Sequence, residues 1–378
     1  MSRVAVLVDW FHPGFKGGGP IRSCFHLVKA LAEAHEVFVL TRDRDLGDED
    51  PYTDIPVDQW VQRQGYRIMY LGGSNPSLSR IRSVLRELAP EHIYLNSVFS
   101  FPFSIWPLMM NRLGLMRGDQ QITLAPRGML LGSALAKKGI KKKMFFTLFR
   151  SIYQRDNVRF HATNEKEARS ITDMFGRRRI FVAANLPDSD QKPLQVIGKI
   201  PGELRLLYLA RIDPIKNLLL LLRILGTCSS EIRLTIAGPV EDQGYWAECQ
   251  RTIADFAENI HVRVVGAVEP EQAKVLMKEA HVYVMLSRGE NFGHSIFESF
   301  LCGRPVVISD QTPWRGLSQE GVGHDLPLDD EKAVHDALEE AAGWDQQAFG
   351  QRAASSWSFA KRYLENDASR KTYFEMFS

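Results

Sequence analysis

The sequence predicts an α/β protein built from two doubly wound parallel-sheet domains. Short apolar, β-rich runs alternate along the chain with amphipathic stretches of helical spacing, which is typical of parallel sheets. This alternation occurs twice, and a stretch with three prolines and little periodicity lies between the two series. A chain of 378 residues is also longer than one hydrophobic core usually organises.

The first series begins at the amino terminus with a strand, a glycine-rich loop and a helix. Ile21, Phe25 and Val28 recur at helical spacing between the first two strands, after the loop with Gly17, Gly18 and Gly19. Glycines at this place let the backbone approach a phosphate or an acceptor, although a plain surface loop is the alternative. The expected strands are Val4–Val8, Glu36–Thr41, Arg67–Leu71, His92–Asn96, Gln121–Ala125 and Arg159–Ala162.

The second series has expected strands at Leu204–Ala210, Ile232–Ala237, Val262–Val265, Val282–Leu286 and Val306–Ile308. We expect an N-terminal domain over residues 1–188, a linker over 189–203, a C-terminal domain over 204–357 and a last helix over 358–378. Ligands of doubly wound sheets bind beyond the carboxyl ends of the strands. The loops after Val8, Ala125, Ala210, Ala237 and Leu286 are therefore where we expect the chemistry.

Composition excludes several classes of protein. No apolar run approaches the roughly 20 residues that span a bilayer, and the first residues do not make a signal peptide. The expected location is the cytoplasm. The four cysteines are far apart and form no Cys-x-x-Cys pair, which disfavours zinc or a redox dithiol and predicts four packing residues: Cys24, Cys228, Cys249 and Cys302.

Positive charge gathers in the middle of the N-terminal half. Residues 101–180 hold 16 Lys or Arg and 5 Asp or Glu, although the net charge of the chain is only +2. Such a stretch favours an anionic partner. A lysine run followed by Met144, Phe145 and Phe146 indicates contact with an anionic membrane, and a solvated lysine face over a phenylalanine core is the alternative. The run contains Lys137, Lys138, Lys141, Lys142 and Lys143. No recognition module for nucleic acid accompanies it.

Two cations follow the first strand of the second series. Arg211 and Lys216 lie five residues apart on one strand-exit loop. Arginine binds a diphosphate as a bidentate fork and lysine binds it as a point charge. A solvated pair on a surface turn is the alternative.

Two carboxylates follow the strand Val282–Leu286. Glu290 and Glu298 are separated by seven residues, and a helix is expected to begin near His294. A helix N-terminus attracts phosphate, and carboxylates accept hydrogen bonds from paired sugar hydroxyls. Exposed helix carboxylates are the alternative, but the upstream cations and the Ala-Gly-Pro segment at 237–239 favour a site.

The segments ARIDPIKNL (210–218), AGP (237–239) and ENFGHSIFESFLCGRPVV (290–307) resemble the C-terminal signature of family 4 glycosyltransferases. The resemblance extends more weakly through the glycine-rich loop, the PRGML segment at 126–130 and HATNEKEA at 161–168. It implies the GT-B fold, which consists of two Rossmann-like domains facing a cleft. It also implies retaining transfer without a metal, and a closing helix that returns to the N-terminal domain.

The resemblance implies a role for each matching residue. Arg211 and Lys216 bind the donor diphosphate, Glu290 contacts the transferred sugar and Glu298 holds the ribose. The remaining expected donor-binding residues are Gly17, Gly18, Gly19, Gly238, Asn291, Phe292 and Gly293. On the acceptor side we expect Asn96, Arg127 and His161, with a structural salt bridge as the alternative for Arg127.

One position departs from the family. Many members have a histidine near the end of the fourth N-terminal strand, where this chain has Asn96 and Ser97. No general base is carried over, and the leaving phosphate is the expected acceptor of the proton. The tripeptides Asp43-Arg44-Asp45 and Asp188-Ser189-Asp190 match the Asp-x-Asp pattern of metal-dependent transferases, but acidic loops produce this pattern easily. We expect no metal and no cofactor.

The sequence therefore predicts a glycosyltransferase that moves a hexosyl group from a UDP- or GDP-sugar to a glycan or lipid-linked acceptor in cell-surface polysaccharide synthesis. The alternatives are a nucleotide-sugar epimerase or hydrolase of the same fold and a non-catalytic nucleotide-sugar binding subunit. The enzyme is expected in the cytoplasm, with peripheral contact to the inner face of the membrane.

Overall fold

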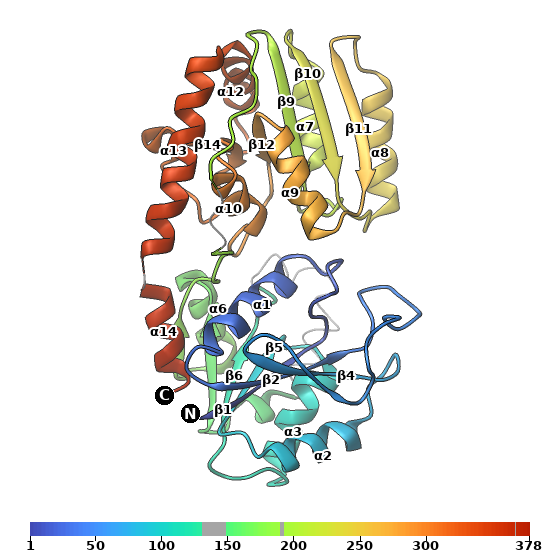
Figure 1. Cartoon of the computed structure of the whole chain (residues 1–378), viewed down its shortest axis with the longest axis vertical. Helices are drawn as coiled ribbons and strands as arrows, with labels where there is room; N and C mark the ends of the chain where they lie inside the picture. The colour runs from blue at the N-terminus through green and yellow to red at the C-terminus, as the bar shows by residue number, and fades with distance from the viewer. Residues whose placement is uncertain (131–148, 190–192, 367) are drawn as a thin grey trace. The chain divides into compact units, whose positions relative to one another are not determined.

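The computed structural model describes residues 1–130, 149–189, 193–366 and 368–378 (Figure 1). The chain forms two compact units, one made of Met1–Leu186 with Asp367–Ser378 and the other of Pro187–Asn366. The expected lysine run, Lys137 to Lys143, lies outside the described residues. In the described ranges, no helix combines the length and the hydropathy that crossing a membrane requires.

The N-terminal unit alternates strands and helices as expected from its periodicity. Its strands are β1 Arg3–Val8, β2 Glu36–Arg42, β3 Trp60–Gln62, β4 Tyr66–Leu71, β5 His92–Asn96, β6 Gln121–Ala125, β7 Val158–Ala162 and β8 Ile180–Val182. Its helices are α1 Gly19–Leu31, α2 Leu78–Leu88, α3 Trp106–Arg112, α6 Glu165–Phe175 and α14 Ala368–Met376, with short helical turns η1 Phe101–Ile105 and η2 Arg150–Tyr153.

These strands form one sheet in the order β3-β4-β2-β1-β5-β6-β7-β8. All neighbours are parallel except β3 and β4. Alternate side chains of β1 enter different cores, since Ala5 and Leu7 pack with α2, α3 and α6, whereas Val4 and Val6 pack with α1 and α14. Helices therefore cover both faces of the sheet, which explains its continuous apolar strands.

The C-terminal unit repeats this architecture. Its strands are β9 Glu203–Leu209, β10 Glu231–Ala237, β11 Ile260–Gly266, β12 Val282–Met285, β13 Val306–Ser309 and β14 Gly323–Leu326. Its helices are α7 Leu218–Leu225, α8 Gln243–Ala254, α9 Pro270–Glu279, α10 His294–Leu301, α11 Leu317–Glu320, α12 Glu331–Gly343 and α13 Gln346–Glu365.

The C-terminal sheet is parallel in the order β11-β10-β9-β12-β13-β14. One face packs against α7, α8 and α12, and the other against α9, α10 and α13. This confirms the predicted doubly wound class for both units. The strand order reverses between β9 and β12, and doubly wound sheets bind ligands at the carboxyl ends of the strands at such a reversal.

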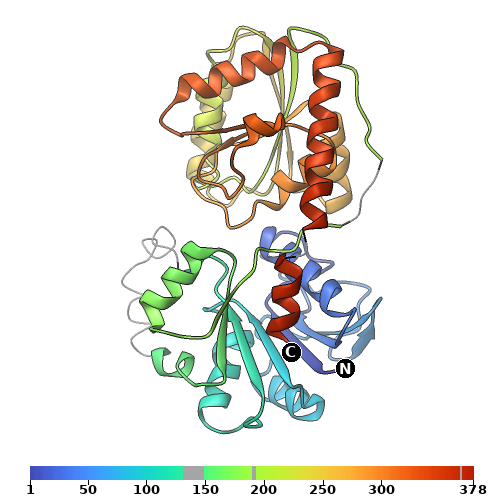
Figure 2. The same ribbon diagram turned by 90° about the vertical axis from the view of Figure 1, so that its left-hand side faces the viewer.

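The end of the chain differs from the single helix expected over 358–378. Two helices are present, and α13 belongs to the C-terminal unit, where it packs beside α10 (Figure 2). Ala360 of α13 is fully buried in the core with Phe300. Only α14 belongs to the N-terminal unit, where Tyr373, Met376 and Phe377 enter the core with α1. The apolar side chains on the two halves of this segment therefore serve different cores.

The segment expected as a linker over 189–203 is packed where it is described. Lys199 is buried and donates from Nζ to the carbonyl oxygens of Ala342 and Trp344 at 2.8 and 3.0 Å. These bonds satisfy carbonyls at the end of α12, which have no partner within the helix. Residues 193–202 therefore belong to the C-terminal unit and do not act as a free tether.

Candidate functional site

The cations and one carboxylate predicted from the sequence lie on the two loops that leave the sheet at its strand reversal. Arg211 and Lys216 follow β9, and Glu290 follows β12. The loops are joined by backbone, because Arg288 N donates to the carbonyl of Ile215 at 2.8 Å. The sheet topology therefore brings together residues that are more than seventy positions apart.

The β9 loop is shaped by a carboxylate that the sequence reading did not single out. Asp213 is buried and accepts hydrogen bonds from the backbone N–H groups of Ile215 and Lys216 at 2.7 and 3.0 Å. Asn217 then adopts a left-handed conformation, φ 57°, directly before α7. These constraints fix where the Lys216 side chain leaves the backbone.

Lys216 and Glu290 form an ion pair with 2.5 Å between Nζ and Oε1. The side chains are only 15% and 11% exposed, so solvent screens the pair less than it screens a surface pair. The pair holds a cation, which can bind a phosphate, beside a carboxylate, which can accept hydrogen bonds from hydroxyl groups.

Arg211 lies at the same edge and has its own acidic partners. Its Nη1 donates to Glu241 Oε1 at 2.5 Å, and its Nη2 lies 3.7 Å from Asp213 Oδ2. The arginine is the more exposed of the two cations, with 37% of its side chain accessible. Glu241 was missed in the sequence because nothing in its spacing identifies a partner of Arg211.

Gly238 permits the close approach of two strand exits. Its φ is 146°, and a Cβ there would lie 1.9 Å from the carbonyl oxygen of Ala210. The residue next to Ala210 is Arg211, whose backbone nitrogen would lie 3.3 Å from that Cβ. Gly238 therefore positions the backbone that carries Arg211, and the structure offers this as a physical reason for the glycine.

The turn before α10 is buried on one side. Phe292 packs against Trp314, and Trp314 Nε1 donates to the Phe292 carbonyl. Gly293 then starts the helix in a left-handed conformation, φ 77°, where a Cβ would lie 2.7 Å from Ile296 Cδ1. Glu290 and Asn291 precede this turn, so the expected helix N-terminus is present directly after the predicted sugar carboxylate.

Glu298 lines a pocket of the C-terminal unit. It lies on α10. The other residues that line this pocket include Lys274 and Lys278 of α9, and Asp188 and Gln195 from the segment before β9. Neither Lys216 nor Glu290 is among the residues that line this pocket. Lys274 Nζ lies 3.8 Å from Asp188 Oδ2, so the aspartate of the second Asp-x-Asp tripeptide has a lysine partner. Asp190 lies outside the described residues.

The residues expected on the acceptor side form one network in the N-terminal unit. Arg127 follows β6 and donates from Nε to Asn96 Oδ1 at 2.7 Å and from Nη2 to the Tyr94 hydroxyl at 2.8 Å. The same hydroxyl lies 2.7 Å from His161 Nδ1. These partners are neutral, so the salt bridge considered for Arg127 is not formed among the described residues.

Two residues at the carboxyl ends of β5 and β6 have a strained backbone conformation. Ser97 after β5 has φ 141° and Arg127 after β6 has φ 54°, although neither is glycine. The Ser97 hydroxyl accepts a hydrogen bond from Phe99 N at 3.1 Å, which stabilises the turn. Residues held in sparsely populated conformations cluster at functional sites. Asn96 and Arg127 thus remain candidates for an acceptor contact.

His161 has a different place from the one expected. Its side chain is 0% exposed, and Nε2 lies 2.9 Å from the Ala183 carbonyl while Nδ1 faces Tyr94. Burial is at odds with direct contact to an acceptor. The histidine instead positions the Tyr94 hydroxyl, which in turn holds Arg127.

Because His161 is buried, we expect the stability of the N-terminal unit to fall at acidic pH. Burial, together with the Arg127 charge, lowers the pKa of His161 to about 3 from 6.5. Above pH 6.5 the imidazole is neutral in both states; below it the unfolded chain takes up a proton and the folded chain does not, so stability falls as the pH drops from 6.5 towards 3. His161 alone contributes a limiting slope of about 1.4 kcal/mol per pH unit to the stability of the unit.

We expect His161→Gln to reduce the pH dependence of the free energy of unfolding. The measurement is urea unfolding at several pH values, with amide hydrogen exchange reporting on the N-terminal unit. His261→Gln, which removes an imidazole on the exposed surface, is the matched control and should keep the wild-type slope. An unchanged slope in His161→Gln contradicts the assignment.

The remaining predicted residues also lie in the N-terminal unit. Gly17, Gly18 and Gly19 lead into α1, with Gly18 as its N-cap. Asp43 and Asp45 are buried, and Asp45 Oδ2 accepts from the backbone N–H groups of Phe15 and Lys16 at 2.7 and 3.0 Å. These bonds give the first Asp-x-Asp tripeptide a structural explanation.

Comparison with known proteins places this geometry in a known class. Residues 190–342 match the family model described as glycosyl transferases group 1. The chain is 24% identical over 374 residues to GDP-mannose:cellobiosyl-diphosphopolyprenol alpha-mannosyltransferase of Xanthomonas oryzae pv. oryzae (strain PXO99A), covering 96% of this chain and 93% of the relative.

Two solved structures share the whole fold. Sucrose-phosphate synthase from Thermosynechococcus elongatus superposes with a TM-score of 0.69 at 16% identity, covering 100% of this chain and 98% of the other. HepE of Anabaena, solved in complex with UDP and glucose, gives a TM-score of 0.69 at 14% identity, covering 100% and 99%. With the two doubly wound units, these matches identify the chain as a glycosyltransferase with the GT-B fold, similar to bacterial surface-glycan enzymes.

Proposed function

We propose that this enzyme is a family 4 glycosyltransferase that moves a hexosyl group from a nucleotide-diphosphate sugar to a lipid-linked glycan with retention of configuration. The observation that carries the proposal is the Lys216–Glu290 pair at the strand reversal of the C-terminal sheet, with Arg211 on the same loop. A diphosphate needs fixed positive charge as its bond to the sugar breaks, and Lys216 and Arg211 supply it without a metal ion.

Each donor-side residue has a distinct part in this reaction. Lys216 and Arg211 stabilise the charge that develops on the diphosphate, and Glu290 accepts hydrogen bonds from hydroxyls of the transferred sugar. Glu298 binds the ribose, which its place in a pocket between α9 and α10 supports. Because Glu241 and Glu290 neutralise the two cations in the structure, the diphosphate must compete with them for Arg211 and Lys216.

The acceptor assignment rests on the N-terminal unit and on one relative. The Xanthomonas mannosyltransferase acts on a cellobiosyl group linked to a diphosphopolyprenol. Arg127 donates to the neutral oxygens of Asn96, Tyr94 and Asn185, and a cation with such partners suits an anionic group of such an acceptor. The lysine run at 137–143 is proposed to contact the inner face of an anionic membrane, where a lipid-linked acceptor lies.

The test is transfer by the full chain in the presence of a chelator. GDP-mannose and UDP-glucose are supplied with a polyprenyl-diphosphate disaccharide, and the product is analysed by NMR. We expect nucleoside diphosphate to be released only with acceptor, and the new bond to keep the donor's anomeric configuration. Inversion, dependence on manganese, or donor turnover without acceptor contradicts the proposal, and the last of these outcomes indicates an epimerase or hydrolase.

A further inference from the structure

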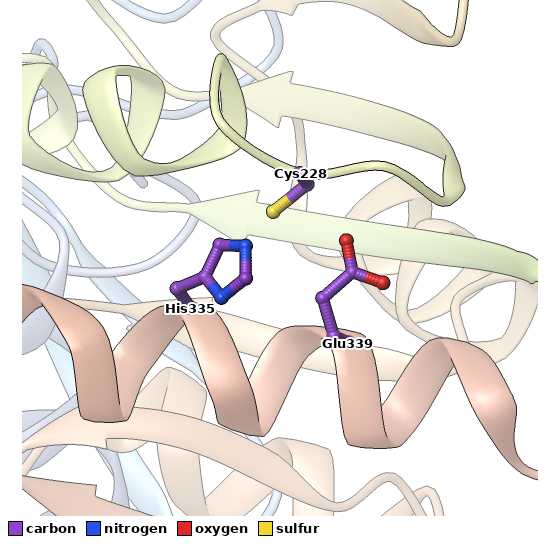
Figure 3. Close-up of side chains that lie close together, drawn as sticks. All are labelled: Cys228, His335 and Glu339. Atoms are coloured by element: carbon purple, nitrogen blue, oxygen red, sulfur yellow. The ribbon is translucent and has the colours of Figure 1, made fainter.

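Three side chains that zinc ions favour as ligands meet near the amino-terminal end of β10 (Figure 3). Cys228 lies in the turn between α7 and β10, and His335 and Glu339 lie one turn apart on α12. The ligand atoms of all three lie within 4.8 Å of one another. Zinc binds sulfur at about 2.3 Å and nitrogen or oxygen at about 2.0–2.2 Å, so a small contraction brings the three atoms to one ion.

The fold fixes this arrangement. Residues four apart on a helix share a face, so α12, which contacts α7, presents His335 and Glu339 together to Cys228 in the turn after α7. Cys228 is buried in the same core as Val334 and Leu338 of α12, whereas His335 and Glu339 are partly exposed. The thiol is therefore held in place, and solvent reaches the other two side chains.

The surroundings of His335 and Glu339 resemble the outer shell of a metal site. His335 Nδ1 lies 3.1 Å from Asp336 Oδ1, which leaves Nε2 as the metal-binding nitrogen. Figure 3 shows a ring nitrogen facing the thiol and the carboxylate. Metal-bound histidines usually donate their second ring N–H to a carboxylate in this way, and the partner fixes the ring.

Glu339 is oriented by two serines. Its Oε1 accepts hydrogen bonds from Ser229 N at 2.6 Å and from Ser230 N and Ser229 Oγ at 3.2 Å. Its Oε2 accepts from Ser230 Oγ. The carboxylate is thus directed towards the turn that carries Cys228, and Oε2 keeps a lone pair for a metal ion.

We propose that Cys228, His335 and Glu339 bind one zinc ion, with water as the fourth ligand. On binding, the thiol proton of Cys228 passes to solvent and sulfur forms the Zn–S bond. The ion links α12 to the start of β10, at the opposite end of the strands from Lys216 and Glu290. Its role is to stabilise the C-terminal unit and not to take part in sugar transfer. The sequence predicts Cys228 only as a packing residue, whereas this proposal makes it a zinc ligand.

The test uses the metal-stripped full chain titrated with Co²⁺, whose thiolate complexes absorb in the near ultraviolet. We expect a charge-transfer band that saturates at one ion per chain, disappears when Zn²⁺ is added, and accompanies a higher melting temperature. Cys228→Ser should abolish the band and the shift in melting temperature. Asp336→Asn leaves all three ligands in place and should weaken binding about 10- to 100-fold while the band is retained.

Matched controls separate this site from other thiols and imidazoles. Cys302→Ser and His261→Asn remove a cysteine and a histidine elsewhere in the same unit and should bind Co²⁺ as the wild type does. A band that persists in Cys228→Ser, a titration that never saturates, or wild-type affinity in Asp336→Asn overturns the proposal. Each readout is spectroscopic or thermal, so failure here is distinguishable from failure of the proposed transferase reaction.

Discussion

Lys216→Ala and Glu290→Ala should each reduce kcat/KM on the order of 10²- to 10³-fold, because each removes a preorganised charge from the proposed donor site. The two losses should not add in the double variant, since the side chains are in direct contact at 2.5 Å. Steady-state transfer assays measure both effects, and circular dichroism checks that the fold is kept.

The two substitutions should differ in donor binding. Lys216→Ala removes the proposed diphosphate contact and should weaken binding of the nucleoside diphosphate itself, whereas Glu290→Ala should weaken binding of the intact sugar nucleotide more than that of the diphosphate. Lys332→Ala, which removes an 83% exposed lysine on α12, is the control and should transfer at the wild-type rate. Near-normal turnover in Lys216→Ala and Glu290→Ala refutes the assignment.

The interior of both sheets could be predicted from sequence because buried parallel strands are continuous apolar runs. Each of the eleven expected strands overlaps a strand of the structure, but β3, β8 and β14 were not expected. These three lie at sheet edges, most of their residues are only partly buried, and each is only three or four residues long, which is too short to give a periodic signal. The sequence also could not predict that α13 and α14 pack in different cores, because apolar residues recur at helical spacing in both.

The residues proposed to bind the donor could be placed side by side from the sequence more easily than the network around Arg127, for a physical reason. Arg211, Lys216 and Glu290 each follow a recognisable strand, and sheet topology alone brings such strand exits together. The partners of Tyr94, Glu241 and Asp213 are polar groups that come together only after folding. No local sequence pattern predicts such contacts. His161 shows the same limit, because a histidine at the end of a strand is equally compatible with a site and with a buried hydrogen bond.

Gly238→Ala should have the largest effect on stability among single substitutions at this site. The added Cβ would lie 1.9 Å from the Ala210 oxygen and 2.6 Å from its carbonyl carbon, both backbone atoms that cannot rotate away. The φ of 146° is also unfavourable for alanine. Strain and overpacking together cost about 2–6 kcal/mol, so the urea midpoint of the C-terminal unit should fall.

The same substitution should also weaken donor binding, because relieving the clash moves the backbone that carries Arg211. Gly343→Ala is the matched control: no atom lies within 4 Å of its added Cβ, and it ends α12, so alanine should be neutral or stabilise the helix by up to about 1 kcal/mol. If Gly238→Ala unfolds at the wild-type urea concentration and binds donor normally, the two strand exits are not held by this contact. If both properties fall together, packing at Gly238 and charge at Arg211 belong to one structural unit, in which the geometry of the sheet sets the position of the diphosphate.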